Sequence, residues 1–146
     1  MAVVDPVLLR QTTVFSSCTE EQCARLAEAG EITHHAVGEI LAEEGSIGHR
    51  FRLFLEGEAE VERAGRPVGT VRRGEFMGEI GLLGGGPATA TVRCTKPATC
   101  LTIWREPFWE LLEAEPAIAL RILEVVCRRL EQQLARAESP MANLPP

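Results

Sequence analysis

Between residues 31 and 103, short runs of alternating apolar and polar residues are separated by glycine, proline or acidic turns. An alternation with a period of two places every second side chain on the same face, so each run predicts a half-buried strand. The pattern is clearest in the runs 39–42, 51–55, 58–62 and 89–93. Many short strands with regular turns are typical of a β-sandwich or a β-barrel. The chain should therefore fold into a mainly β domain.

A helix should precede this β region. Thr19 and Gln22 have the spacing of a capping box, in which each side chain accepts a hydrogen bond from the other residue's backbone amide. The helix should continue through Ala29, and Gly30 is placed to end it in the left-handed conformation.

Two helices should follow the β region. Pro107 lies at the start of a short helix that runs through Leu112, and Pro116 opens a long one, because proline suits the first helical turn. A chain of 146 residues with 45% hydrophobic residues has room for one ordinary core. We therefore expect one domain over residues 1–138 and a flexible tail over 139–146. Within the domain we expect a helical N-terminus at about 5–30, a β-barrel at about 31–104 and C-terminal helices at about 105–138.

The long C-terminal helix carries two apolar rows. One row recurs at spacings of three and four, and consists of Leu120, Leu123, Cys127, Leu130, Leu134 and Ala137. The row beside it consists of Ile118, Ile122, Val125 and Val126. A helix with two apolar faces needs two partners, so we expect one face to pack on the barrel and the other on the same helix of a second subunit. This arrangement predicts a homodimer; the alternative is that both rows pack on the barrel of one monomer.

The composition argues against nucleic acids and membranes as partners. The net charge is −6 and Lys96 is the single lysine, so no uniform basic surface is available for DNA phosphates. No run approaches the roughly 18 to 20 apolar residues that a membrane span needs, and the N-terminal MAVVDPVLL lacks the basic start of a signal peptide. We expect a cytoplasmic protein that binds neither DNA by itself nor a membrane.

The five cysteines do not form a metal-binding pattern. They are Cys18, Cys23, Cys94, Cys100 and Cys127, without a CxxC pair. Buried or half-buried free thiols are the expected state. An iron–sulfur centre at Cys18 and Cys23 is the alternative, although it would have only two of the four ligands normally needed.

The sequence also lacks the motifs of an enzyme. Adjacent strand residues point to opposite faces, so His34 and His35 cannot easily bind one metal ion. No phosphate-binding loop for nucleoside triphosphates and no nucleophile elbow is present. We therefore expect no catalytic residues, no metal site and no cofactor.

Residues 74–92, GEFMGEIGLLGGGPATATV, contain two glycine–acid pairs around a short apolar run, followed by a glycine-rich loop. This segment resembles the phosphate-binding cassette of the cyclic nucleotide-binding domain family. The earlier stretch VGEILAEEGSIGHRFRLFLEGEAEVER resembles the first barrel half of the same family. The resemblance covers roughly Leu8 to Ala137 and implies a double-stranded β-helix, or jelly-roll barrel, with N-terminal helices and a long C-terminal helix. The family's catabolite-activator branch continues into a helix-turn-helix module that is missing here, so the chain resembles a sensor with an unknown output partner.

The resemblance also implies a ligand site. In the family, the Gly-Glu pair that matches Gly78 and Glu79 faces the ribose hydroxyl, and an arginine nine residues after the glutamate binds the cyclic phosphate. Here that position holds Ala88. Backbone amides of residues 84–87 could still form a nest for the phosphate, and Thr89 could lend its hydroxyl. The candidate ligand-binding residues are Gly78, Glu79, Gly86, Pro87, Ala88, Thr89, Ala90, Arg129 and Gln133.

Two arginines are candidates for the missing charge. Arg129 matches a family position on the long helix where an arginine approaches the cassette glutamate, and Gln133 falls near the place where that helix covers the purine. Arg93 shares a strand face with Thr89 and Thr91, and it could reach the ligand only if that face lines the pocket. We therefore expect a regulatory module with weakened or altered binding of a possible cAMP or cGMP ligand. The alternative is a degenerate scaffold that keeps the fold for dimerisation and protein–protein contact.

Overall fold

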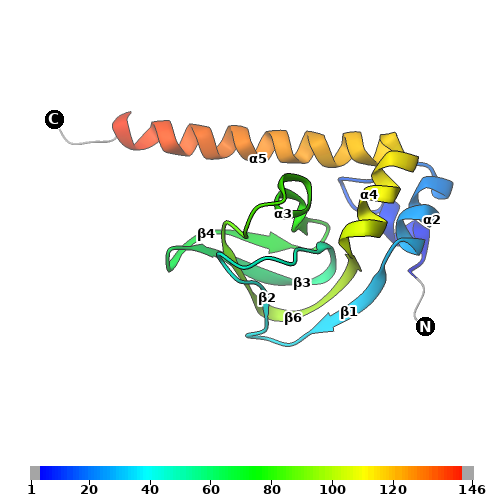
Figure 1. Cartoon of the computed structure of the whole chain (residues 1–146), viewed down its shortest axis with the longest axis horizontal. Coiled ribbons are helices and arrows are strands. Elements are labelled where there is room, and N and C mark those ends of the chain that lie inside the picture. The colour runs from blue at the N-terminus through cyan, green and yellow to red at the C-terminus, as the bar shows by residue number, and fades with distance from the viewer. Residues whose placement is uncertain (1–3, 143–146) are drawn as a thin grey trace.

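The computed structural model describes residues 4–142 of the chain. Its helices are α1 (Pro6–Arg10), α2 (Glu20–Glu28), α3 (Glu79–Gly84), α4 (Arg105–Ala114) and α5 (Pro116–Ala142). Its strands are β1 (Glu31–His35), β2 (Ile40–Ala42), β3 (Phe51–Arg63), β4 (Arg66–Arg72), β5 (Phe76–Met77) and β6 (Thr91–Ile103). Figure 1 shows α5 lying along one side of the β region, with α1, α2 and α4 gathered near its first turns. The expected mainly β architecture with flanking helices and a long C-terminal helix is confirmed.

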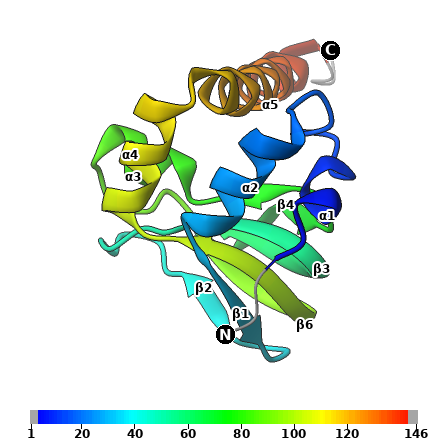
Figure 2. The same ribbon diagram turned by 90° about the vertical axis from the view of Figure 1, so that its right-hand side faces the viewer.

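The six strands form one antiparallel sheet centred on β3 and β6. These two 13-residue strands pair with each other along their lengths, and the strand order is β1-β6-β3-β4. The short strands β2 and β5 pair with β6 and β3. The sheet curves (Figure 2), but β1 and β4 do not pair with each other within residues 4–142. The predicted β-barrel is therefore not closed in the structure: alternation predicts strands, but closure depends on pairing between strands far apart in the sequence.

A stack of three phenylalanines joins the sheet to the helices. The ring of Phe51 on β3 lies 4.9 Å from that of Phe108 on α4 and 5.2 Å from that of Phe76 on β5, measured between centroids. Ile118 and Ile122 of α5 are fully buried in the same cluster. The apolar face of the first turns of α5 is thus fixed to the domain, which sets the direction of the rest of the helix.

The ends of α2 follow the sequence signals only in part. The capping box of Thr19 and Gln22 is present, with both reciprocal hydrogen bonds. Gly30 does not adopt the predicted left-handed conformation. A Cβ at Gly30 would overlap the carbonyl oxygen of Thr102, so the glycine allows close approach of β6 rather than a helix stop.

Both predicted C-terminal helices are present, but α5 continues through Ala142, beyond the predicted end at residue 138. The predicted end lies just before Ser139 and Pro140, but the backbone stays helical past them, because helicity does not require apolar contacts at every turn. Of the predicted tail over 139–146, residues 143–146 lie outside the described residues.

The two apolar rows of α5 have different surroundings. Ile118 and Ile122 are at most 1% exposed, whereas Leu120 and Leu123 are each 53% exposed and Leu134 is 63% exposed. The alternative that both rows pack on one monomer is therefore wrong. None of the helices in residues 4–142 is long and apolar enough to cross a membrane.

Candidate functional site

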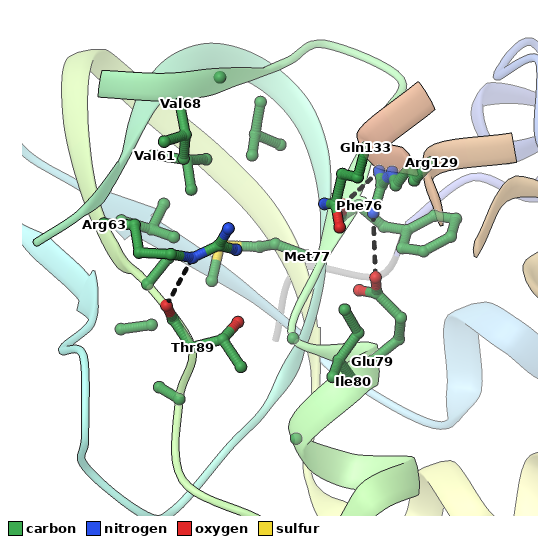
Figure 3. A pocket seen from close by; sticks show the side chains of 18 of the residues that line it. Val61, Arg63, Val68, Phe76, Met77, Glu79, Ile80, Thr89, Arg129 and Gln133 are labelled. Atoms are coloured by element: carbon green, nitrogen blue, oxygen red, sulfur yellow. Dashed lines mark hydrogen bonds and ion pairs between the residues drawn. The ribbon is translucent and has the colours of Figure 1, made fainter. Parts of the chain in front are cut away.

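A pocket of about 730 Å³ lies between the sheet, the loop after α3 and one face of α5 (Figure 3). This volume lies in the range of roughly 300 to 1,000 Å³ that is typical of small-molecule sites. Eight of the nine candidate ligand-binding residues line it: Gly78, Glu79, Pro87, Ala88, Thr89, Ala90, Arg129 and Gln133. Gly86 does not line it, and its carbonyl oxygen accepts a hydrogen bond of 2.6 Å from His49 Nε2.

Gly78 directs the chain into α3 and thereby places Glu79. Its φ of 92° lies in the left-handed region, which glycine adopts without strain. A Cβ at this position would overlap the carbonyl oxygen of Arg50. Because α3 begins at the next residue, Glu79 is held with its side chain pointing towards α5 (Figure 3).

The Glu79 carboxylate is buried and paired with Arg129. Arg129 Nη1 lies 3.0 Å from Glu79 Oε1, and Nη2 donates a hydrogen bond of 2.7 Å to the carbonyl oxygen of Phe76. The guanidinium also lies 4.5 Å from the centre of the Phe76 ring. Burial raises the pKa of Glu79, and Arg129 opposes that shift. The Arg129–Glu79 pair predicted from the resemblance is therefore present.

The second oxygen of Glu79 has no partner. Among the described residues, Glu79 Oε2 is the one buried side-chain oxygen or nitrogen without a hydrogen bond. An unsatisfied buried polar group costs roughly 1 to 3 kcal/mol, and more when it is charged. Since a carboxylate oxygen only accepts, a hydroxyl donor placed in the pocket would satisfy it.

The glycine-rich loop does not form the expected nest of amides at the pocket. The amide of Gly85 donates to the carbonyl oxygen of Gly81 at 2.9 Å, and the amide of Ala88 donates to that of Ser46 at 2.9 Å. Residues 84–86 lie outside the lining, while residues 87–90 form part of it. Of the residues predicted to form the nest, Gly85 uses its amide to end α3, and residues 84–86 do not line the pocket.

The positive charges near the pocket differ from those expected. Arg93 is exposed on β6 and does not line the pocket, whereas its neighbour Val92 does. Arg63, at the end of β3, lines the pocket and donates from Nε to the carbonyl oxygen of Thr89 at 3.1 Å. Sequence reasoning missed Arg63. Its spacing of two from Val61, which also lines the pocket, is the signal that could have found it.

No metal centre is formed by the residues that the structure describes. Among the side chains of residues 4–136, no three of histidine, cysteine, aspartate or glutamate are arranged to hold an ion. Cys18, Cys23, Cys94 and Cys100 are buried, whereas Cys127 is exposed. Burial raises the pKa of Cys23 to about 11 and that of Cys100 to about 12, so these thiols stay protonated and unreactive.

A Cys127→Ser protein should therefore contain no fast-reacting thiol. In a native titration with Ellman's reagent it should react at none of its remaining cysteines, and all four should react after unfolding. Metal analysis of the purified protein should find no stoichiometric iron or zinc. Stoichiometric iron that depends on Cys18 or Cys23 would contradict this prediction.

Comparison with known proteins reveals sequence relatives over most of the chain. Residues 32–115 match the family model of the cyclic nucleotide-binding domain. A cAMP-dependent protein kinase regulatory subunit of Hypocrea atroviridis is 31% identical over 104 residues, which cover 71% of this chain and 22% of that protein. A cGMP-dependent protein kinase of Plasmodium berghei is 27% identical over 107 residues, covering 73% of this chain and 12% of that protein. The chain thus spans less than a quarter of the length of these curated relatives.

Solved structures share the fold. The catabolite activator protein of Thermus thermophilus superposes with a TM-score of 0.80 at 20% identity, covering 88% of this chain and 62% of that one. The N-terminal domain of a transcriptional regulator from Streptomyces coelicolor A3(2) has a TM-score of 0.67 at 28% identity, and the match covers 88% of this chain and 93% of that one.

Proposed function

The chain belongs to the cyclic nucleotide-binding domain family, and on that premise we propose that it is a non-catalytic regulatory module that binds a cyclic nucleotide beside Glu79. Cyclic AMP and cyclic GMP are the candidate ligands, because the relatives include a cAMP-dependent regulatory subunit and a cGMP-dependent kinase. The bound state would act on a partner protein, because the relatives include a regulatory subunit of a cAMP-dependent protein kinase.

The observation that carries this proposal is the free Oε2 of Glu79. A carboxylate that is 3% exposed keeps one oxygen without a donor at a pocket of suitable volume. The ribose 2′-hydroxyl of a cyclic nucleotide is a donor of the right kind, and Arg129 already compensates the charge on the other oxygen. Gln133 lines the same pocket from α5, where its amide is available to a purine edge.

Binding should be altered relative to a protein with an arginine at position 88. The side chain of Ala88 offers neither a hydrogen-bond donor nor a charge, and its amide is already bonded to Ser46. A charge-assisted contact in a desolvated site contributes roughly 2 to 5 kcal/mol, so a pocket without one binds an anion about thirtyfold to several thousandfold more weakly.

Titration calorimetry with cAMP and 2′-deoxy-cAMP tests the proposal. The deoxy ligand should bind at least about tenfold more weakly, because it leaves Glu79 Oε2 without a donor. At a hundred times its dissociation constant, cAMP or cGMP should add about 2.7 kcal/mol of stability, which a melting curve detects. Glu79→Gln should reduce the difference in affinity between cAMP and 2′-deoxy-cAMP. Absence of binding by both cyclic nucleotides would refute the proposal.

A second candidate function is a scaffold that dimerises through α5. The observation that favours it is the exposed leucine row, with Leu120, Leu123, Leu130 and Leu134 between 47% and 63% exposed. Apolar residues at a/d spacing along one helix suit the same helix of a second copy. Dimerisation is compatible with ligand binding, so sedimentation of the ligand-free protein addresses it separately.

A further inference from the structure

Arg63 reaches the pocket from the side opposite the Arg129–Glu79 pair. It is the last residue of β3, and Figure 3 shows its guanidinium extending across the pocket wall beside Met77. Its Nε donates to the carbonyl oxygen of Thr89, the residue that follows Ala88. The guanidinium therefore lies next to the cassette loop at the place where position 88 supplies no donor.

The other arginines that line the pocket do not offer free donors beside the cassette loop. Arg129 uses its two terminal nitrogens on Glu79 and Phe76, so its charge is compensated. Arg136 also lines the pocket, but its hydrogen bond is to the carbonyl oxygen of Val68 on β4 and not to the cassette loop. Arg63 forms no ion pair with residues 4–136, whose side chains the structure describes, and Nε is the nitrogen that its hydrogen bond uses. Its two terminal nitrogens thus remain as donors for an anion.

The backbone around Arg63 is held by the turn before β3. Ala64 adopts a φ of 52°, which is uncommon for a residue with a side chain, and its amide donates to Glu44 Oε1 at 2.9 Å. The amide of Glu44 donates in turn to Thr91 Oγ1 at 3.0 Å. The neighbouring amide of Gly45 donates to the carbonyl oxygen of Ala88 at 2.8 Å. One turn therefore connects the hairpin that carries Arg63 to the loop that carries Ala88.

We propose that Arg63 binds the cyclic phosphate of the ligand through its terminal nitrogens and makes the pocket selective for an anionic nucleotide over a neutral nucleoside. This inference rests on the proposed function and names the source of positive charge in that site. A guanidinium presents a planar fork of donors that matches two phosphate oxygens. The charge also offsets the repulsion between the Glu79 carboxylate and the anionic ligand. In this arrangement the phosphate-binding arginine comes from the end of β3 and not from position 88, which is occupied by Ala88.

Calorimetry on Arg63→Gln with cAMP and adenosine as probes tests this role. The variant should bind cAMP at least about tenfold more weakly than the wild type, the low end for a hydrogen bond to a charged group, because Arg63 is an exposed side chain. Adenosine, which has no phosphate, should bind both proteins equally. Arg93→Gln is the matched control, because it removes an exposed arginine from the neighbouring strand outside the pocket. It should leave the cAMP dissociation constant within about threefold, since exposed charges beyond the site are screened.

A rescue experiment separates loss of the phosphate contact from damage to the pocket. Ala88→Arg in the Arg63→Gln protein should regain at least about tenfold in cAMP affinity, because it returns a guanidinium to the same phosphate from the loop. If the wild type binds cAMP and Arg63→Gln binds it equally well, this inference is wrong while the proposed function stands. An equal loss in Arg93→Gln would also overturn it. If the wild type binds neither cAMP nor cGMP, both proposals fail, whether or not Ala88→Arg binds them.

Discussion

Replacing Arg129 with alanine is expected to lower the free energy of unfolding by about 3 to 5 kcal/mol at neutral pH. The reason is that Glu79 is 3% exposed, and Arg129 is its ion-pair partner, at 3.0 Å. Removing one partner of a buried pair leaves the other charge desolvated and uncompensated. The variant also loses the hydrogen bond to Phe76 and the contact with its ring. Urea unfolding of the two proteins, followed by circular dichroism, measures the difference.

The effect of Arg129→Ala should depend on pH. Burial raises the pKa of Glu79 and Arg129 lowers it, so the variant should have a still higher Glu79 pKa. A carboxyl group with a raised folded-state pKa stabilises the fold below its unfolded-state pKa and loses that contribution as pH rises through the folded value. The penalty in the variant should therefore shrink as pH falls from neutrality towards the ordinary glutamate value of about 4.3. A penalty that stays constant over this range would contradict the proposed cause.

Two further variants isolate the buried charge. Glu79→Gln combined with Arg129→Ala should recover most of the lost stability at neutral pH, because no carboxylate remains buried. Arg128→Ala is a matched control on the next residue of α5: its guanidinium lies 3.8 Å from Glu124 and is largely exposed. Arg128→Ala should lower the free energy of unfolding by less than about 1 kcal/mol, because an exposed ion pair contributes little to stability. If Arg128→Ala and Arg129→Ala lower the free energy of unfolding equally, the loss comes from removing an arginine from α5 and not from the buried charge of Glu79.

Replacing Leu123 with aspartate is expected to convert a dimer into monomers. In the proposed dimer the leucine row of α5 faces its copy, so the substitution would bury two unpaired carboxylates in one seam. Dimerisation should weaken at least about a hundredfold, or roughly 2.7 kcal/mol, because an unpaired buried charge costs several kcal/mol. Analytical ultracentrifugation of wild type and variant at the same concentration gives the comparison. A wild-type protein that sediments as a monomer would remove the basis for this prediction.

The choice of position matters for this test. Leu130 belongs to the same row but also lines the pocket, so a charge there would disturb both the seam and the ligand site. Leu123 is 53% exposed and lies outside the pocket lining. Leu83→Asp on α3 is the matched control, since Leu83 is 40% exposed and does not belong to the leucine row of α5. It should leave the oligomeric state unchanged, and cAMP titrations of the Leu123 variant should match those of the wild type.

The candidate site shows where sequence reasoning succeeded and where it failed. The resemblance placed Glu79 and Arg129 together although they are 50 residues apart, and they form an ion pair. It did not reveal that the amides of Gly85 and Ala88 are used inside the protein. The sequence analysis considered Arg93 and missed Arg63, because both lie on strands with alternating faces and alternation alone does not say which face meets a pocket.

Local signals in the sequence determined the elements themselves. The capping box at Thr19 and the alternation over residues 31–103 predicted a helix and strands, because these features depend on residues within one or two turns of each other. The tertiary structure decided three further features: that the sheet is open, that the leucine row is exposed, and that Arg63 contacts Thr89. Each depends on segments distant in the sequence, such as the 26 residues between Arg63 and Thr89. Burial and charge compensation are properties of the assembled core, so residue patterns alone do not determine them.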